Sequence, residues 1–147
     1  MNINQIYLFF QSVAFLHCVM TCEHLDIKSS LILCPLNTVM NWAKEINMWQ
    51  TDARSKLKVF KFYDCKDVES KVRLLQSWKR QGGVGIMHYD MYRLLLDDGI
   101  PTTRKARNKK IKKSKTSIQL DKHRGTIKEC LLENPDLVIA DEGHLLK

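Results

Sequence analysis

The residues best suited to chemistry lie near the C-terminus, in the segment VIADEGHLLK at residues 138–147. An apolar run ends there in two adjacent carboxylates, Asp141 and Glu142, and Gly143 and His144 follow. A carboxylate at the tip of a buried strand can hold Mg²⁺, which prefers oxygen ligands and keeps several waters. A second carboxylate can orient an attacking water, and phosphoryl transfer needs mainly such positioning and charge neutralisation. Two acids after a strand can also be only a solvated turn, so the pair alone does not distinguish a metal site from a turn.

The elements that must position these carboxylates alternate between strands and helices. Short apolar runs predict strands at residues 30–35, 57–64, 84–89 and 137–142. Helical periodicity predicts helices within residues 1–20, 37–50, 67–83, 90–99 and 121–136. Strands separated by such helices form parallel βαβ units, so the fold class is α/β, a parallel sheet flanked by helices. The strand at 57–64 alternates apolar and basic residues, as an edge strand does, and we expect the last strand to be central.

The ends of these strands bring the candidate site together. Ligands of open parallel sheets bind at the carboxyl ends of the strands. Pro35, Tyr89 and Asp141 each lie at the end of a predicted strand. We therefore expect these three residues to share one edge of the sheet.

Local signals predict the caps and buried faces of the helices. Asn37 or Thr38 can cap one helix, Asp67 can cap another, and Gly82 or Gly83 can end it. The first helix is expected to bury its apolar positions Ile6, Phe10, Val13, Leu16 and Met20. The next is expected to bury Val39, Trp42, Ala43, Ile46 and Trp49, and all three tryptophans, Trp78 included, are expected in the core. His88 and His123 belong to no motif and receive no role.

Residues 100–120 form a basic insert with no regular apolar period, and we expect a disordered loop. Its cations are Arg104, Lys105, Arg107, Lys109, Lys110, Lys112, Lys113 and Lys115. The chain has 24 basic and 16 acidic residues, so without these eight cations it would be neutral. A solvated loop is the common meaning of such a block, but phosphate binding or nuclear import stays open.

Cysteine usage indicates the redox state of the cellular compartment, and the first twenty residues bear on membrane association. The five cysteines are an odd number without a CxxC pair, which favours a reducing compartment over a disulfide framework. The apolar opening is interrupted by Gln11, Ser12 and His17, and its uninterrupted stretches are shorter than the roughly 20 residues of a span. We therefore expect no membrane association.

The motifs resemble those of a known family. LVIADEGH is similar to motif II, the Walker B box, of superfamily-two helicase-like ATPases. LILCPLNTVMNWAKEINMW resembles motif Ia of the Swi/Snf-type chromatin-remodelling ATPases, and GGVGIMHYDMYRLL resembles the strand and helix that follow. The order CPLNT, NW, GG, YDMYR and DEGH is similar to the ATRX-type branch. The resemblance covers the chain from about Ser12, except the insert. It implies that residues 1–147 form part of a first, N-terminal, RecA-like ATP-binding lobe.

The resemblance also implies cofactors and roles, with ATP and Mg²⁺ as the family's cofactors. Asp141 would coordinate Mg²⁺, Glu142 would position the hydrolytic water, and His144 would couple the nucleotide state to the rest of the motor.

The implied partners are duplex DNA and chromatin in the nucleus, with histones or other chromatin proteins as further partners through regions outside this sequence. Asn37, Thr38 and Asn41 would lie near the DNA backbone. Tyr89 belongs to a motif that also faces DNA.

One family motif is missing from the sequence. No GxxxxGK[ST] phosphate loop occurs, and GGVG at residues 82–85 lacks the lysine. The second lobe is also absent, so we expect a fragment that does not hydrolyse ATP alone. One alternative is a non-catalytic nucleic-acid-binding module that uses the basic insert, with an affinity that falls steeply with salt. Another is a chain that forms no stable fold.

Overall fold

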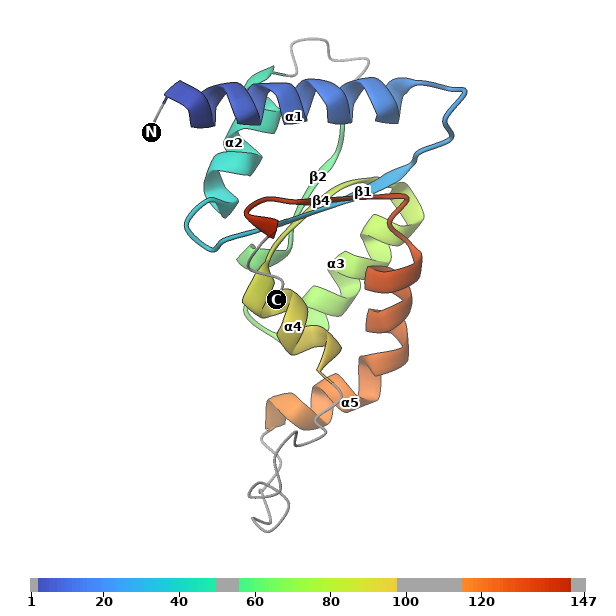
Figure 1. Ribbon diagram of the computed structural model, residues 1–147. Helices are drawn as coiled ribbons and strands as arrows, with labels where there is room; N and C mark the ends of the chain where they lie inside the picture. Colours follow the sequence, from blue (N-terminus) through green and yellow to red (C-terminus); the bar gives the residue numbers. More distant parts are fainter. Residues whose placement is uncertain (1–2, 50–55, 98–114, 144–147) are drawn as a thin grey trace.

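The computed structural model describes residues 3–49, 56–97 and 115–143, in which one parallel sheet lies between two layers of helices (Figure 1). The strands are β1 (Ser29–Cys34), β2 (Val59–Lys61), β3 (Gly83–His88) and β4 (Leu137–Ala140), in the order β2-β3-β1-β4. The helices are α1 (Ile3–Thr21), α2 (Val39–Trp49), α3 (Val68–Gln81), α4 (Tyr89–Leu96) and α5 (Lys115–Lys128). A 3₁₀ turn, η2 (Phe62–Asp64), follows β2, and a π-helical segment, η3 (Glu129–Glu133), follows α5. The α/β prediction is confirmed.

Alternation along β1 divides the core into two halves. Ile32 and Cys34 face α1 and α2, whereas Leu31 and Leu33 face α3, α4 and α5. All four side chains are buried, as a central parallel strand covered on both faces requires. No helix in the described residues is both long and apolar enough to cross a bilayer.

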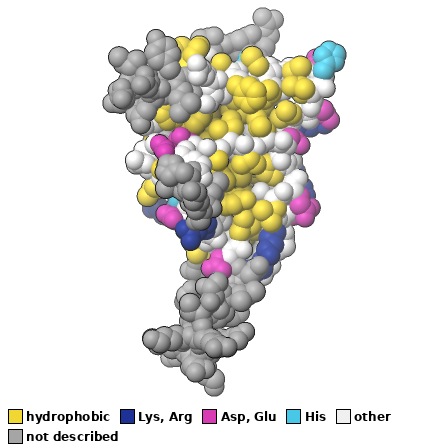
Figure 2. Space-filling model, in the orientation of Figure 1, with side chains coloured by type: hydrophobic (Ala, Val, Ile, Leu, Met, Phe, Trp, Pro, Cys, Tyr) yellow, Lys and Arg dark blue, Asp and Glu magenta, His cyan; other side chains and the backbone are white. Residues whose placement is uncertain are grey.

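The last strand is at the edge of the described sheet, so the prediction of a central strand is wrong there. β4 pairs with β1 only, and Val138 is 52% exposed, whereas Leu137 and Ile139 on the opposite side of the strand pack against the core. β2 forms the other edge, as its alternating sequence predicts. Figure 2 shows hydrophobic side chains gathered over α1 and below it on this face.

Two predicted core positions are also wrong. α1 buries Phe9, while Phe10 is 43% exposed and packs edge-on against Trp49. Trp49 is itself 44% exposed, and its indole N–H donates to Glu45. Both errors arise because apolar residues continue around these helices beyond the buried face.

The caps of α3 agree with the sequence, but the start of α5 does not. Asp67 accepts a hydrogen bond from the Ser70 N–H at 2.8 Å, and Gly82 ends α3 with a left-handed φ of 67°. α5 begins at Lys115, so the expected loop does not extend to Leu120. Residues 98–114, which include most of the insert, lie outside the described residues.

The amino ends of β1 and β4 are joined by one carboxylate. Asp136 accepts hydrogen bonds from the backbone N–H groups of Lys28 and Ser29, at 3.0 and 2.9 Å. The Ser29 hydroxyl donates to the same oxygen. Burial opposes ionisation, but these bonds outweigh it and keep the pKa of Asp136 below its ordinary value. The charged form of Asp136 therefore helps to fix β4 against β1.

Replacing Gly85 with alanine should destabilise the fold. A Cβ there would lie 2.7 Å from the Phe62 ring and 3.2 Å from Trp78, two rings that already pack edge-on. We expect Gly85→Ala to lower the free energy of unfolding by about 1–3 kcal/mol, the usual cost of overpacking. Chemical denaturation measures it. Gly125→Ala is the matched control, because its Cβ meets nothing within 4 Å in α5 and should stabilise by up to about 1 kcal/mol. Equal stabilities for the two variants would contradict the packing argument.

Candidate functional site

The carboxyl ends of β1, β3 and β4 meet at one edge of the sheet, which we call the carboxyl rim (residues 34–42, 88–89 and 141–143). Cys34 pairs in register with His88, and Leu33 pairs with Ala140. The backbone N–H of Asp141 continues the ladder by donating to the Leu33 carbonyl at 2.8 Å. The prediction that Pro35, Tyr89 and Asp141 share one edge is therefore confirmed.

Asp141 is fixed at this rim by contacts from three other elements. Its carboxylate oxygen Oδ2 accepts the indole N–H of Trp42 in α2 at 3.0 Å. Its backbone carbonyl accepts the hydroxyl of Tyr89, the first residue of α4, at 2.5 Å. With the β1 contact, these bonds hold a half-buried carboxylate whose position depends on α2, α4 and β1 together.

Glu142 turns the chain away from the sheet. Its φ is 56°, in the left-handed region, which is uncommon for a residue other than glycine. Its side chain is exposed. The two adjacent acids therefore have different surroundings, one held against the core and the other presented to solvent.

The sequence prediction assigned Trp42 to the core and missed its contact with Asp141. Trp42 is 2% exposed, and Phe9 packs edge-on against its ring at 4.7 Å. A buried indole usually has a partner for its N–H. Trp42 lies in the first turns of a helix that begins at the rim. Its need for a hydrogen-bond acceptor at the rim was therefore a sequence signal that could have predicted the contact with Asp141.

Tyr89 is buried at the rim, and its place in a motif that faces DNA stays a prediction. Only 7% of its surface is exposed, and its hydroxyl is bonded within the chain. Burial raises the pKa of Tyr89, and the nearby charge of Asp141 raises it further, so the hydroxyl stays protonated as a donor.

The residues expected near the DNA backbone lie at the start of α2. Asn37 is exposed, whereas Thr38 and Asn41 are half-buried. Thr38 occupies the position before the helix, where its carbonyl accepts the Trp42 N–H at 3.1 Å. Its hydroxyl does not cap the helix but donates to the Pro35 carbonyl at 3.0 Å. The DNA contacts of these three residues stay predictions.

Other expected site residues fall where no geometry can be given. His144 and the cations at positions 104–113 lie outside the described residues, while Lys115 is the first residue of α5. The nucleic-acid role of the insert stays a prediction.

His88, which belongs to none of the predicted motifs, caps α4. Its ring nitrogen Nδ1 accepts the backbone N–H of Met91 at 3.2 Å, so the ring must be neutral on that nitrogen. Burial lowers the pKa of His88, and the charge of Asp90 opposes the effect only in part. Histidine is not among the usual capping residues, which is why the pattern missed it.

Cys34 lies buried beside His88 in the ladder. Burial raises the pKa of the Cys34 thiol to about 12, so it is a protonated core residue and not a nucleophile.

The rim offers donor chemistry suited to Mg²⁺. Asp141 supplies a carboxylate with Oδ2 bound to Trp42, and Mg²⁺ in proteins is held by one or two carboxylates and several waters. Among the described residues, no three His, Cys, Asp or Glu side chains gather in a way that could enclose a metal. The described rim also contains no glycine-rich phosphate loop. These residues therefore fit one side of a nucleotide site, the metal-binding carboxylate.

A parallel four-stranded sheet flanked by helices on both faces is the architecture of an α/β RecA-like lobe, whose ligands bind at the carboxyl ends of the strands. Residues 10–147 match the model of the SNF2-related domain. The chain belongs to this SNF2-related family, as its Swi/Snf-type motifs predicted.

Three relatives agree with the ATRX-type branch. Human "Transcriptional regulator ATRX" is 35% identical over 139 residues, which cover 93% of this chain. The Drosophila melanogaster ATRX homolog is 37% identical over 119 residues, or 80% of the chain. "Protein CHROMATIN REMODELING 20" of Arabidopsis thaliana is 31% identical over 139 residues, or 94% of the chain. The aligned part spans only 5% of the human protein and 8% of the other two. No solved structure matches the chain significantly.

Removing the indole N–H should weaken the fold through Asp141. We expect Trp42→Phe to lower the free energy of unfolding by about 1–3 kcal/mol, because it removes a hydrogen bond to a carboxylate and some buried volume. A double-mutant cycle with Asp141→Ala should give a coupling of about 1 kcal/mol. Trp78→Phe is the control, since Trp78 is equally buried but donates to the Gly83 carbonyl. Equal coupling of Asp141 to both tryptophans would contradict the assigned bond.

The cap at His88 should make stability depend on pH. The pKa of His88 in the folded protein lies below the ordinary 6.5. The contribution of the neutral His88 cap to the free energy of unfolding is therefore complete above pH 6.5 and is lost as the pH falls through the folded pKa. His88→Asn keeps an acceptor at the cap without a titrating ring. We expect its free energy of unfolding to fall less than that of the wild type below pH 6.5, as measured by denaturation at a series of pH values. Parallel pH curves would show that the cap does not titrate as described.

Proposed function

We propose that this chain is part of the ATP-binding lobe of a helicase-like, ATP-dependent DNA translocase that remodels chromatin. The observation that carries the proposal is the anchored Asp141, next to an exposed Glu142, at the carboxyl rim of an SNF2-related domain.

Each rim residue has a distinct task in this proposal. Asp141 supplies an oxygen to Mg²⁺, directly or through water, while Trp42 keeps the carboxylate in place. Bound Mg²⁺ supplies positive charge against the nucleotide phosphates. Glu142 orients the attacking water. Tyr89 fixes the backbone between the two acids, so that rotating one carboxylate does not displace the other.

The proposed partners are duplex DNA and chromatin, and the proposed compartment is the nucleus. The names of the relatives support this assignment. They include "Protein CHROMATIN REMODELING 20" and the mouse "Helicase ARIP4", which is 32% identical over 147 residues. Asn37, Thr38 and Asn41 are the proposed contacts with the DNA backbone, and His144 is proposed to couple nucleotide state to movement.

These 147 residues do not hydrolyse ATP on their own in this proposal. Their sequence holds the carboxylate side of the site but no GxxxxGK[ST] segment for the phosphates. Each charge-assisted hydrogen bond from such a loop is worth about 1.5–3 kcal/mol, so several missing bonds cost orders of magnitude in affinity.

A chimera tests whether the rim is competent. The matching segment of mouse ATRX, 37% identical over 139 residues, would be replaced by this chain's sequence, and phosphate release would be measured with DNA present. We expect Mg²⁺-dependent turnover, which Glu142→Gln reduces by roughly a hundredfold or more because it removes the water-orienting base. The isolated chain should release no phosphate above background.

Glu133→Gln is the matched control in the chimera, since Glu133 is an exposed carboxylate away from the rim. An active chimera in which Glu142→Gln and Glu133→Gln behave alike would refute the role of Glu142. Turnover by the isolated chain that depends on Glu142 would refute its inactivity.

A further inference from the structure

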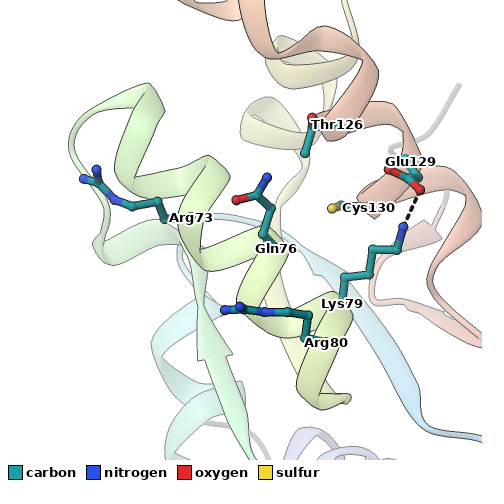
Figure 3. Close-up of a pocket in the computed structure, with 7 residues that line it drawn as sticks. All are labelled: Arg73, Gln76, Lys79, Arg80, Thr126, Glu129 and Cys130. Atoms are coloured by element: carbon teal, nitrogen blue, oxygen red, sulfur yellow. Dashed lines mark hydrogen bonds and ion pairs between the residues drawn. The ribbon is translucent and has the colours of Figure 1, made fainter.

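A groove of about 680 Å³ lies between α3 and the end of α5 (Figure 3). Its lining residues are Arg73, Gln76, Lys79, Arg80, Thr126, Glu129 and Cys130. A second hollow of about 270 Å³ shares Lys79 and Arg80 and continues toward Lys28, at the amino end of β1. The two hollows adjoin at Lys79 and Arg80, and we call them together the α3 groove.

The charge available in the α3 groove is positive. Glu129 is paired with Lys79, as the dashed line in Figure 3 marks. The second carboxylate of the groove, Asp136, accepts hydrogen bonds from the backbone of Lys28 and Ser29. Arg80 has no ion-pair or hydrogen-bond partner among the described residues, and Arg73 donates only to the Ser70 hydroxyl at 3.2 Å. Two guanidinium groups therefore remain for an anionic ligand.

The spacing of these groups suits an extended ligand. Arg73, Gln76 and Arg80 lie on one face of α3, and the two arginines are two helical turns apart, about 10.5 Å along the axis. Gln76 and Thr126 project into the same space and offer polar groups between the charges (Figure 3). An arginine fork binds a carboxylate with two parallel hydrogen bonds.

The lining does not suit single-stranded nucleic acid. None of the seven lining residues of the larger hollow is aromatic, so the stacking platforms used for single-stranded nucleic acid are missing. An extended peptide with several carboxylates is complementary in charge to the two arginine forks.

The second wall has an unusual backbone. Glu129 and Cys130 lie in η3, which forms a π-helical turn, and such turns occur frequently at functional sites. η3 places Glu129 where it holds Lys79, and it leaves the buried Cys130 as the floor. The groove is thus shaped by packing that does not involve the rim.

We propose that the α3 groove binds an acidic peptide segment of a partner protein in an extended conformation. This site is separate from the nucleotide site of the rim, and the two proposals can fail independently.

Binding of a labelled peptide to the whole chain tests this site. The probe is a fluorescent peptide of about eight residues with glutamate at every second position, so that one face of the extended chain carries only carboxylates. We expect saturable binding by fluorescence anisotropy, and a peptide with glutamine in place of glutamate should not bind. The double variant Arg73→Gln/Arg80→Gln should raise the Kd roughly tenfold or more. Arg80→Lys should restore only part of the loss, because lysine keeps the charge without the fork.

Lys66→Gln/Arg93→Gln is the matched control, since it removes two exposed cations outside the groove. Equal weakening by both double variants would show non-specific attraction and overturn the site. Tighter binding of a DNA duplex through Arg73 and Arg80 would overturn the peptide assignment. Hydrogen exchange provides a test that needs no variant: bound peptide should protect α3 and η3, whereas protection of α2 alone would contradict the proposal.

Discussion

The carboxylate of Asp141 is bonded to the indole of a helix that lies 99 residues earlier in the sequence, and the geometry of the rim depends on this contact. A half-buried carboxylate needs partners for its charge, and a buried indole needs an acceptor. Each therefore satisfies the other. The backbone of the same residue is bonded on one side to β1 and on the other to Tyr89, which leaves little freedom for the end of β4. The rim is thus organised before any ligand binds.

A second carboxylate does the same work at the opposite end of the strand. β4 has only four residues and pairs on one side, so its ladder alone would hold it weakly. Asp136 adds bonds to Lys28 and Ser29 at the amino end, and Asp141 adds bonds at the carboxyl end. A slip by one residue would break both sets and turn the apolar side chain of Ile139 away from the core that contains Ile32. Two aspartates, 136 and 141, therefore fix the register of an edge strand.

The sequence predicted whatever depends on local pattern. The βαβ order and the shared edge of Pro35, Tyr89 and Asp141 follow from strand and helix signals, because parallel crossovers leave few other arrangements. The caps at Asp67 and Gly82 follow from residue type. The errors concern contacts and strand pairing that depend on parts of the chain distant in sequence.

Those errors have physical causes. α1 is apolar on several sides, so its own period could not choose Phe9 over Phe10 for the core. Nothing local in Trp42 names Asp141 as its partner. Whether β4 is central or at the edge depends on which strands pair with it, and a single run of apolar residues does not contain that information.

The rim and the α3 groove meet in one strand. Gly85 of β3 leaves room for Phe62 and Trp78, and this seats α3 so that its outer face carries Arg73 and Arg80. The same strand leads directly into Tyr89, which holds the backbone of Asp141. The acids at the rim and the cations of the groove therefore take their positions from a single buried element. Because tightly packed cores transmit displacement, a shift of β3 would be felt in both places. Gly85 within β3 is therefore needed for packing α3, and Tyr89, the residue directly after β3, is needed for placing Asp141.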